Sequence, residues 1–203
     1  PYDNAQFLLF LTAVIKAVDE YQDLIRISVA SAGNDHRLGA SEAPPAIVSV
    51  FLGDELTDIL SAIETDSAYC PKDKVQMKIG VHVIPKFPKD TTDRNRTSPF
   101  AFTGNTFEFR MLGSSASIAD ANITLNTAVA KELAEFADYL EQADDFFTAL
   151  HALIQKTVKE HKRIIFNGNG YDESWIEESA KRGLLNLPST PDCLKYMLSE
   201  KNV

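Results

Sequence analysis

The stretch NAQFLLFLTAVIKAVDEY, residues 4–21, is apolar on most of the surface that a helix would present. Apolar side chains recur from Phe7 to Val18 and leave no wide polar face. A helix at a protein surface is apolar along one stripe only, so this composition is typical of a helix that is buried on several sides. The stretch therefore predicts a scaffold helix against which other elements pack.

The residues after this helix predict a sheet and its loops. Residues 24–30 alternate between apolar and polar side chains, which is the pattern of a half-buried strand. Aromatic residues alternate around Gly104 and Asn105, which indicates a hairpin or two short strands. The other predicted elements are a loop over 31–41, a strand over 46–52, a helix over 54–63, a turn over 64–74, a strand over 75–84, a loop over 85–96 and the hairpin over 100–111.

The last third of the chain predicts helices. Apolar residues recur at helical intervals over 121–142 and 146–161, and shorter helices are predicted over 175–182 and 192–199, with Gly183 as a C-cap. The fold class is therefore α+β, with a mostly antiparallel sheet, flanking helices and a helical C-terminal third. We expect residues 1–120 to form the sheet-bearing part and residues 121–203 a helical part packed on it.

Composition excludes several classes of function. The chain has 203 residues, 44% hydrophobic content and a formal net charge of −9, which opposes non-specific binding to nucleic acid or anionic lipid. It has no apolar run near the ~20 residues that span a bilayer, and it begins without the basic segment of an export signal. Cys70 and Cys193 lack the spacing of a zinc or redox motif. We expect a cytoplasmic protein with reduced thiols and no nucleic-acid or membrane partner. Because the sequence begins with Pro1 and not with an initiator Met, we also expect this chain to be a piece of a longer polypeptide.

Three polar segments could carry chemistry. The segment Asn34–Pro45 contains Arg37, which could grip a carboxylate with its planar fork, and Glu42, which could take a proton or close over a site. The alternative is a solvated connection whose single salt bridge contributes little stability. His36 is a surface or packed histidine on the simpler interpretation.

The other two segments flank the predicted hairpin. Arg94 and Arg96 lie two residues apart in a polar loop, and such pairs suit phosphate, although a solvated basic loop would look the same. In Phe107–Arg110, the aromatic residues face one side of a strand, while Glu108 and Arg110 face the other, roughly 7 Å apart. That charged face is either a surface ion pair or the floor of a groove where Glu108 binds a metal and Arg110 an anion.

Together and in this order, the three segments resemble the glutamine synthetases. SAGNDHRLGA with EAPP, RNRT, and TGN before the FEFR strand are most similar to the long bacterial type III enzymes, and NITLN occupies the place of the family's Asn-Pro-Tyr helix entry. The resemblance covers most of the chain. It implies the C-terminal part of the catalytic region of an ATP-dependent ligase that joins ammonia to the side-chain carboxylate of L-glutamate through an acyl phosphate.

The resemblance also implies roles for single residues. Arg37 and Arg110 would bind glutamate, Arg96 would contact phosphate of ATP and the reacting group, and Glu108 would be a metal ligand. Glu42 would form the flap, shield the acyl phosphate from water and accept a proton from ammonium. The implied cofactors are ATP and Mg²⁺ or Mn²⁺, and the implied parent is a large homo-oligomeric ring.

The sequence departs from the family in ways that leave alternatives open. Residues 100–106 lack the basic residues that commoner family types carry there, and the earlier metal-binding glutamates and histidine lie upstream in the family. We therefore expect the 203-residue piece alone to be inactive. A non-catalytic glutamine-synthetase-like binding or assembly module, or a ligase that uses another amine, would share the same three segments.

Overall fold

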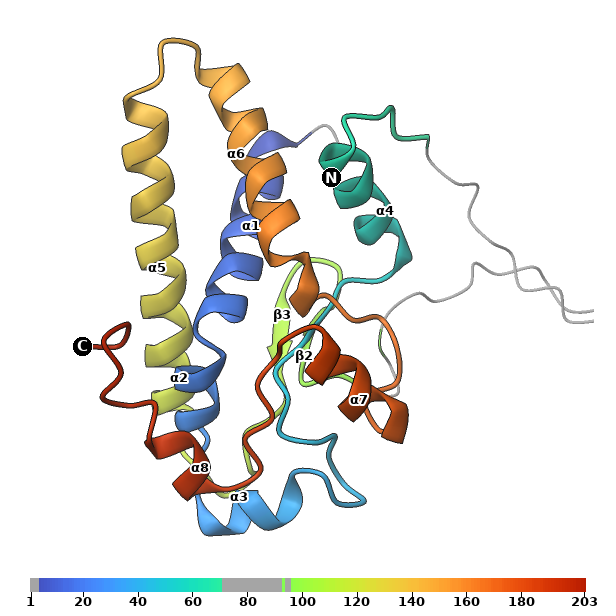
Figure 1. Cartoon of the computed structure of the whole chain (residues 1–203), viewed down its shortest axis with the longest axis vertical. Coiled ribbons are helices and arrows are strands. Elements are labelled where there is room, and N and C mark those ends of the chain that lie inside the picture. Colours follow the sequence, from blue (N-terminus) through green and yellow to red (C-terminus); the bar gives the residue numbers. More distant parts are fainter. Residues whose placement is uncertain (1–3, 71–92, 94–95) are drawn as a thin grey trace, which may run out of the picture.

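The computed structural model describes residues 4–70, 93 and 96–203 (Figure 1). The elements are α1 (Ala5–Glu20), α2 (Gln22–Ile27), α3 (Ala32–Arg37), β1 (Val50–Phe51), α4 (Asp54–Glu64), β2 (Phe100–Phe102), β3 (Phe107–Phe109), α5 (Ala119–Glu141), α6 (Phe146–His161), the 3₁₀ helix η1 (Lys162–Ile164), α7 (Glu173–Lys181) and α8 (Thr190–Leu194). This arrangement confirms the α+β class. No helix in these ranges is long and apolar enough to cross a membrane.

Helix α1 is the scaffold of the fold, as its composition predicts. It begins where Asn4 Oδ1 accepts the N–H of Phe7 at 2.9 Å, which satisfies one of the free donors of the first turn. Its side chains Leu11, Ile15 and Val18 are buried. Helices α5 and α6 run along it and pack against it (Figure 1), so α1 is covered on several sides.

One hydrophobic core joins α1 to the sheet and to the later helices. The core contains Leu11 and Ile15 of α1, Val50 of β1, Ile59 of α4, Ile154 of α6 and Trp175 of α7.

The bounds of α5 and α6 confirm the two long helices expected from the periodicity of the last third. The division of the chain at residue 120 stays a prediction.

The described sheet has three strands in the order β1-β2-β3. Strand β2 pairs antiparallel with β3, with Phe100 opposite Phe109, and the connecting turn holds Gly104 at a φ of +103°, which favours glycine. The hairpin expected over 100–111 is confirmed. Strand β1 pairs parallel with β2, so the described sheet contains one parallel and one antiparallel pair.

Two expectations for residues 24–41 are wrong. The predicted strand over 24–30 is largely helix α2, and the predicted loop over 31–41 contains helix α3. The strand prediction assumed that Arg26 faces solvent. Its side chain is only 1% exposed, and it forms an ion pair with Asp35 at 2.6 Å. Its Nε also donates to the carbonyl of Leu187 at 2.8 Å. A tertiary ion pair therefore buried a charge that the local pattern placed outside.

The remaining elements agree with the sequence to different degrees. The helix over 54–63 is confirmed as α4, whereas the strand over 46–52 is regular only at β1. Helix α7 ends before Gly183, whose φ of +72° is the backbone conformation of a C-cap glycine. Helix α8 begins two residues earlier and ends sooner than expected. The strand over 75–84 and most of the loop over 85–96 lie outside the described residues.

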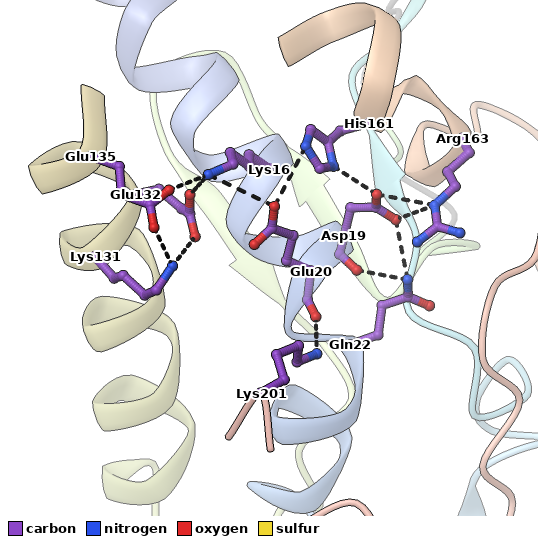
Figure 2. A network of polar contacts seen from close by, with 10 residues as sticks. All are labelled: Lys16, Asp19, Glu20, Gln22, Lys131, Glu132, Glu135, His161, Arg163 and Lys201. Atoms are coloured by element: carbon purple, nitrogen blue, oxygen red, sulfur yellow. Dashed lines mark hydrogen bonds and ion pairs between the residues drawn. The ribbon is translucent and has the colours of Figure 1, made fainter. Parts of the chain in front are cut away.

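Two polar networks attach α1 to α5 and α6 (Figure 2). Lys16 of α1 pairs with Glu132, whose side chain is fully buried, and with Glu135 at 2.6 Å. Glu135 is also paired with Lys131 at 2.6 Å. Burying one of these charges without its partners would be costly, so the network fixes how α5 lies on α1.

The second network lies one turn further along α1. Asp19 Oδ2 is 2.8 Å from His161 Nδ1 at the end of α6, and Asp19 Oδ1 accepts from Arg163 Nε at 2.9 Å (Figure 2). Gln22 Nε2 also donates to Asp19 Oδ1 at 3.1 Å. The buried carboxylate of Asp19 therefore connects α1 to the junction of α6 and η1.

Candidate active site

Helix α3 places Arg37 against the end of strand β3. The helix begins at Ser31, whose hydroxyl accepts the N–H of Asn34 at 3.1 Å. Arg37 is its last residue, and its Nη1 donates to the carbonyl of Met111 at 3.1 Å while its Nη2 donates to the carbonyl of Arg110 at 3.3 Å. These bonds therefore join the segments of Arg37 and Arg110, which are far apart in sequence.

Asn34 connects the same two segments. Its side chain is buried, and its Nδ2 donates to the carbonyls of Val29 at 2.8 Å and Met111 at 2.9 Å. Its Oδ1 accepts from Arg37 Nη1 at 3.1 Å. Because these bonds fix both the backbone and the guanidinium, Asn34 determines where Arg37 lies.

Strand β3 carries the third predicted segment with the expected alternation. Phe107 and Phe109 pack against the core, and the ring of Phe107 stacks on Phe100 at 5.0 Å between centroids. Glu108 and Arg110 pair on the opposite face: Glu108 Oε2 accepts from Arg110 Nε at 3.0 Å and from Nη2 at 2.8 Å. The Glu108 side chain is 51% exposed and that of Arg110 only 16%.

Asp93 binds Nη1 of Arg110, the guanidinium nitrogen that does not bind Glu108. Its Oδ2 accepts from Arg110 Nη1 at 2.8 Å and from the N–H of Ser98 at 2.9 Å. Its Oδ1 accepts from the N–H of Thr97 at 3.0 Å and from the Thr97 hydroxyl at 2.8 Å. Burial alone would raise the pKa of this carboxyl, but the bonds from Thr97 and Ser98 outweigh it and hold the pKa below its usual range. Asp93 is therefore a charged carboxylate with four hydrogen-bond donors around it.

Arg96 lies exposed in the turn that Asp93 organises. Its N–H donates to the carbonyl of Asp93 at 3.2 Å, and its φ is +54°, a conformation uncommon for a residue with a side chain. Such backbone strain persists only where the surroundings fix it, and here the Asp93 bonds do so. Arg94, the other arginine of the predicted pair, lies outside the described residues.

The Asn167–Gly170 turn holds two of the predicted segments together. The N–H of Gly170 donates to the carbonyl of Thr97 at 2.9 Å. A Cβ at position 170 would lie 2.4 Å from that oxygen and 3.3 Å from Cβ of Pro44. Only glycine therefore allows the loop of Arg96 and the EAPP segment to approach the same backbone.

Glu42 lies at the exposed tip of the EAPP segment. The loop is closed at its base by the N–H of Gly39, which donates to the carbonyls of Ala43 at 3.2 Å and Pro44 at 3.0 Å. Within the described ranges, no hydrogen bond or ion pair joins Glu42 to the arginines. The structure thus brings Arg37, Glu108 and Arg110 together, with Arg96 on the adjoining loop, whereas Glu42 is exposed and makes no described bond to them.

Known proteins match this chain along its length. A type-3 glutamine synthetase from Dictyostelium discoideum is 48% identical over 206 residues, which cover 100% of this chain. A glutamine synthetase from Butyrivibrio fibrisolvens is 48% identical over 208 residues and also covers 100% of it. The chain belongs to the glutamine synthetase family.

Two further comparisons define which part of a glutamine synthetase this is. The family model of the glutamine synthetase C-terminal domain matches residues 149–203. A glutamine synthetase from Bacteroides fragilis is 46% identical over 203 residues, which cover 97% of this chain. The chain spans only 28% to 29% of the length of these three relatives. It therefore corresponds to a portion of a glutamine synthetase.

The side chain of Glu108 is predicted to bind a divalent cation. A half-exposed carboxylate is a hard oxygen donor of the kind that Mg²⁺ prefers. In the part of the chain that the structure describes, however, no three His, Cys, Asp or Glu side chains are grouped closely enough to hold a metal. A metal-binding role for Glu108 therefore stays a prediction.

Sequence reasoning missed Asn34, which lies inside a segment that resembles glutamine synthetases, and Asp93, which directly precedes another such segment. Neither had an assigned role, because a lone amide or carboxylate in a polar loop carries no local signal. The signal that could have found Asp93 is its position four residues before Thr97 in a turn rich in donors, where Asp side chains accept backbone N–H bonds. Its bond to Arg110 has no signal in the local sequence.

Proposed function

We propose that this chain forms part of the catalytic site of an ATP-dependent glutamate–ammonia ligase. The observation that carries the proposal is the guanidinium of Arg110, held between Asp93 and Glu108 while Arg37 binds the backbone of the same residue. Two arginines joined through the backbone of residue 110 suit a dicarboxylate, because a guanidinium can bind a carboxylate with two parallel hydrogen bonds. L-Glutamate, with two carboxylates and an amine, fits such a site.

The described residues suggest a division of roles. Arg37 and Arg110 bind glutamate, and Glu108 exchanges its bonds with Arg110 for a place beside the bound cation. The exchange is feasible because Glu108 is half exposed, whereas the bond between Arg110 and Asp93 is shielded from water. The Nε and Nη2 donors of Arg110, which now face Glu108, are then free to bind the substrate carboxylate.

Phosphoryl transfer from ATP to the glutamate side chain would produce an acyl phosphate that ammonia then attacks. Arg96, which is exposed on its turn, would neutralise phosphate charge as it moves from ATP to glutamate. A Mg²⁺ or Mn²⁺ ion would supply further charge neutralisation at the phosphates. Glu42, on its exposed loop, would cover the acyl phosphate and accept a proton from ammonium.

The finer features of the enzyme belong to the same proposal. We expect the full-length protein to act in the cytoplasm as a large homo-oligomeric ring. We also expect its complete sheet to be mostly antiparallel, since the described strands are only part of it. The similarity to three glutamine synthetases over nearly the whole chain supports these expectations.

The test is synthesis by the purified full-length protein. With ATP, Mg²⁺, L-glutamate and ammonia, we expect glutamine, ADP and phosphate in equal amounts, and no glutamine when any one substrate is omitted. Assembly into a ring without glutamine formation would favour the non-catalytic module. Faster product formation with another amine than with ammonia would favour the related ligase.

A further inference from the structure

We infer that Asp93 is a positioning residue that sets the guanidinium of Arg110 for glutamate and ties it to the loop of Arg96. This inference rests on the proposed function, because it concerns how the same site binds its substrate. Asp93 touches neither substrate in this role and acts through its two neighbours.

The first support is the geometry around the Asp93 carboxylate. Four donors surround it within 3.0 Å: the N–H and hydroxyl of Thr97, the N–H of Ser98 and Nη1 of Arg110. The side chain is 3% exposed. A carboxylate with all its acceptor positions used cannot rotate without losing several bonds at once, so it provides a rigid reference for Arg110.

The second support is how the bonds of Arg110 are divided. Asp93 takes Nη1, whereas the fork formed by Nε and Nη2 faces the exposed Glu108. A buried ion pair therefore holds one edge of the guanidinium, and the edge that can bind a carboxylate bidentately points toward the accessible side. Without Asp93, Nη1 would lose its partner and the guanidinium could turn toward solvent.

The third support is that one carboxylate binds both the turn of Arg96 and the end of strand β3. The bonds to Thr97 and Ser98 close the turn in which Arg96 adopts its positive φ, and the bond to Arg110 reaches strand β3. If Arg110 binds glutamate and Arg96 binds phosphate, Asp93 fixes the distance between the two reacting partners. Small errors in such a distance reduce rates strongly.

The experiment compares Asp93→Asn with Asp19→Asn in the full-length protein. Asp19 is a matched control, because it is equally buried and paired with an arginine, but it lies in the network between α1 and α6. Glutamate binding is measured by calorimetry, which does not depend on turnover, and unfolding temperature is measured for both variants. We expect both variants to unfold at lower temperature. Only Asp93→Asn should weaken glutamate binding, by about ten- to a hundredfold.

A double-mutant cycle separates positioning from general destabilisation. If Asp93 acts through Arg110, Asp93→Asn should weaken glutamate binding by less than about threefold in the Arg110→Lys background. Full additivity of the two effects would overturn the inference. If Asp93→Asn does not fold, Thr97→Val replaces it, since it removes one of the four bonds and should weaken glutamate binding several-fold. Unchanged binding in that variant would equally overturn the inference.

The outcomes also distinguish this inference from the proposed function. A wild-type protein that binds glutamate but makes no glutamine would refute the ligase and leave the Asp93 test intact. A wild-type protein that does not bind glutamate would overturn both. An active ligase in which Asp93→Asn binds glutamate normally would refute only the role of Asp93.

Discussion

Nη1 of Arg110 lies 2.8 Å from Oδ2 of Asp93, and this ion pair joins strand β3 to the turn that carries Arg96. Asp93 is almost fully buried and Arg110 largely so. Because the pair is shielded from water, it is stronger and more rigid than the exposed pair that Arg110 makes with Glu108. The relationship explains how Arg110, for which we propose a role in binding glutamate, keeps its orientation at the end of a strand.

Arg110→Lys in the full-length protein should raise the KM for glutamate roughly tenfold or more, which corresponds to at least ~1.4 kcal/mol. Lysine keeps the positive charge toward Asp93 but lacks the planar fork that a carboxylate binds with two hydrogen bonds. Steady-state kinetics with varied glutamate checks this. Arg163→Lys, a change of the same type in the pair with Asp19, is the control and should leave the KM for glutamate within twofold. Equal values for both variants would contradict the role of Arg110.

Glu42→Ala should slow glutamine formation by the ~10²–10⁴ typical of a positioned acid or base, while ATP and glutamate still bind. Without the flap carboxylate, water should reach the acyl phosphate more easily. We therefore expect more than one phosphate released per glutamine formed, in a reaction that still depends on glutamate. Glu55→Ala on α4 removes an equally exposed carboxylate and should change neither rate nor ratio. A normal rate with one phosphate per glutamine in Glu42→Ala would remove Glu42 from the site.

Gly170→Ala should destabilise the protein by about 1–3 kcal/mol and impair use of ATP. The new Cβ would lie 2.4 Å from the carbonyl oxygen of Thr97, and this is backbone that cannot move without shifting the turn of Arg96. Chemical denaturation and the KM for ATP measure the two effects. Gly33→Ala in α3 is the control, because nothing lies within 4 Å of its added Cβ. A stable Gly170→Ala with normal use of ATP would show that the turn does not hold the Arg96 loop.

Glu135→Gln should lower the free energy of unfolding at pH 6 by less than ~1 kcal/mol, because Glu135 is about half exposed and water screens its pairs. Hydrogen bonds from Lys131 and Lys16 lower the pKa of Glu135 to about 2 from its ordinary value of 4.5 (Figure 2). Since the folded pKa is the lower one, the contribution is complete above about pH 4.5 and is lost as the pH falls toward 2. The difference between wild type and variant should therefore shrink between pH 6 and pH 3. Glu141→Gln on the same helix controls for removal of a charge, and a constant difference across this range would contradict the pairing.

The sequence by itself determined the long helices, the hairpin and the family to which the chain belongs. Helices α1, α5 and α6 follow from apolar periodicity over many residues, and the β2–β3 hairpin from alternating aromatic residues around Gly104. These signals are local, because a helix or hairpin face must be apolar wherever it is buried. The family resemblance placed Arg37, Glu108 and Arg110 in one site, and the structure brings them together.

Only the tertiary structure decided the course of residues 22–37 and the partners of the buried charges. The alternation around Arg26 suggested a strand, but ion pairing with Asp35 buries that arginine and allows the segment to form a helix. Asp93 likewise had no assigned role until its carboxylate was seen against Arg110, seventeen residues away. The physical reason is the same in both cases. A charge enters the interior only when a partner meets it there, and that partner is supplied by the fold and not by neighbouring residues in the sequence.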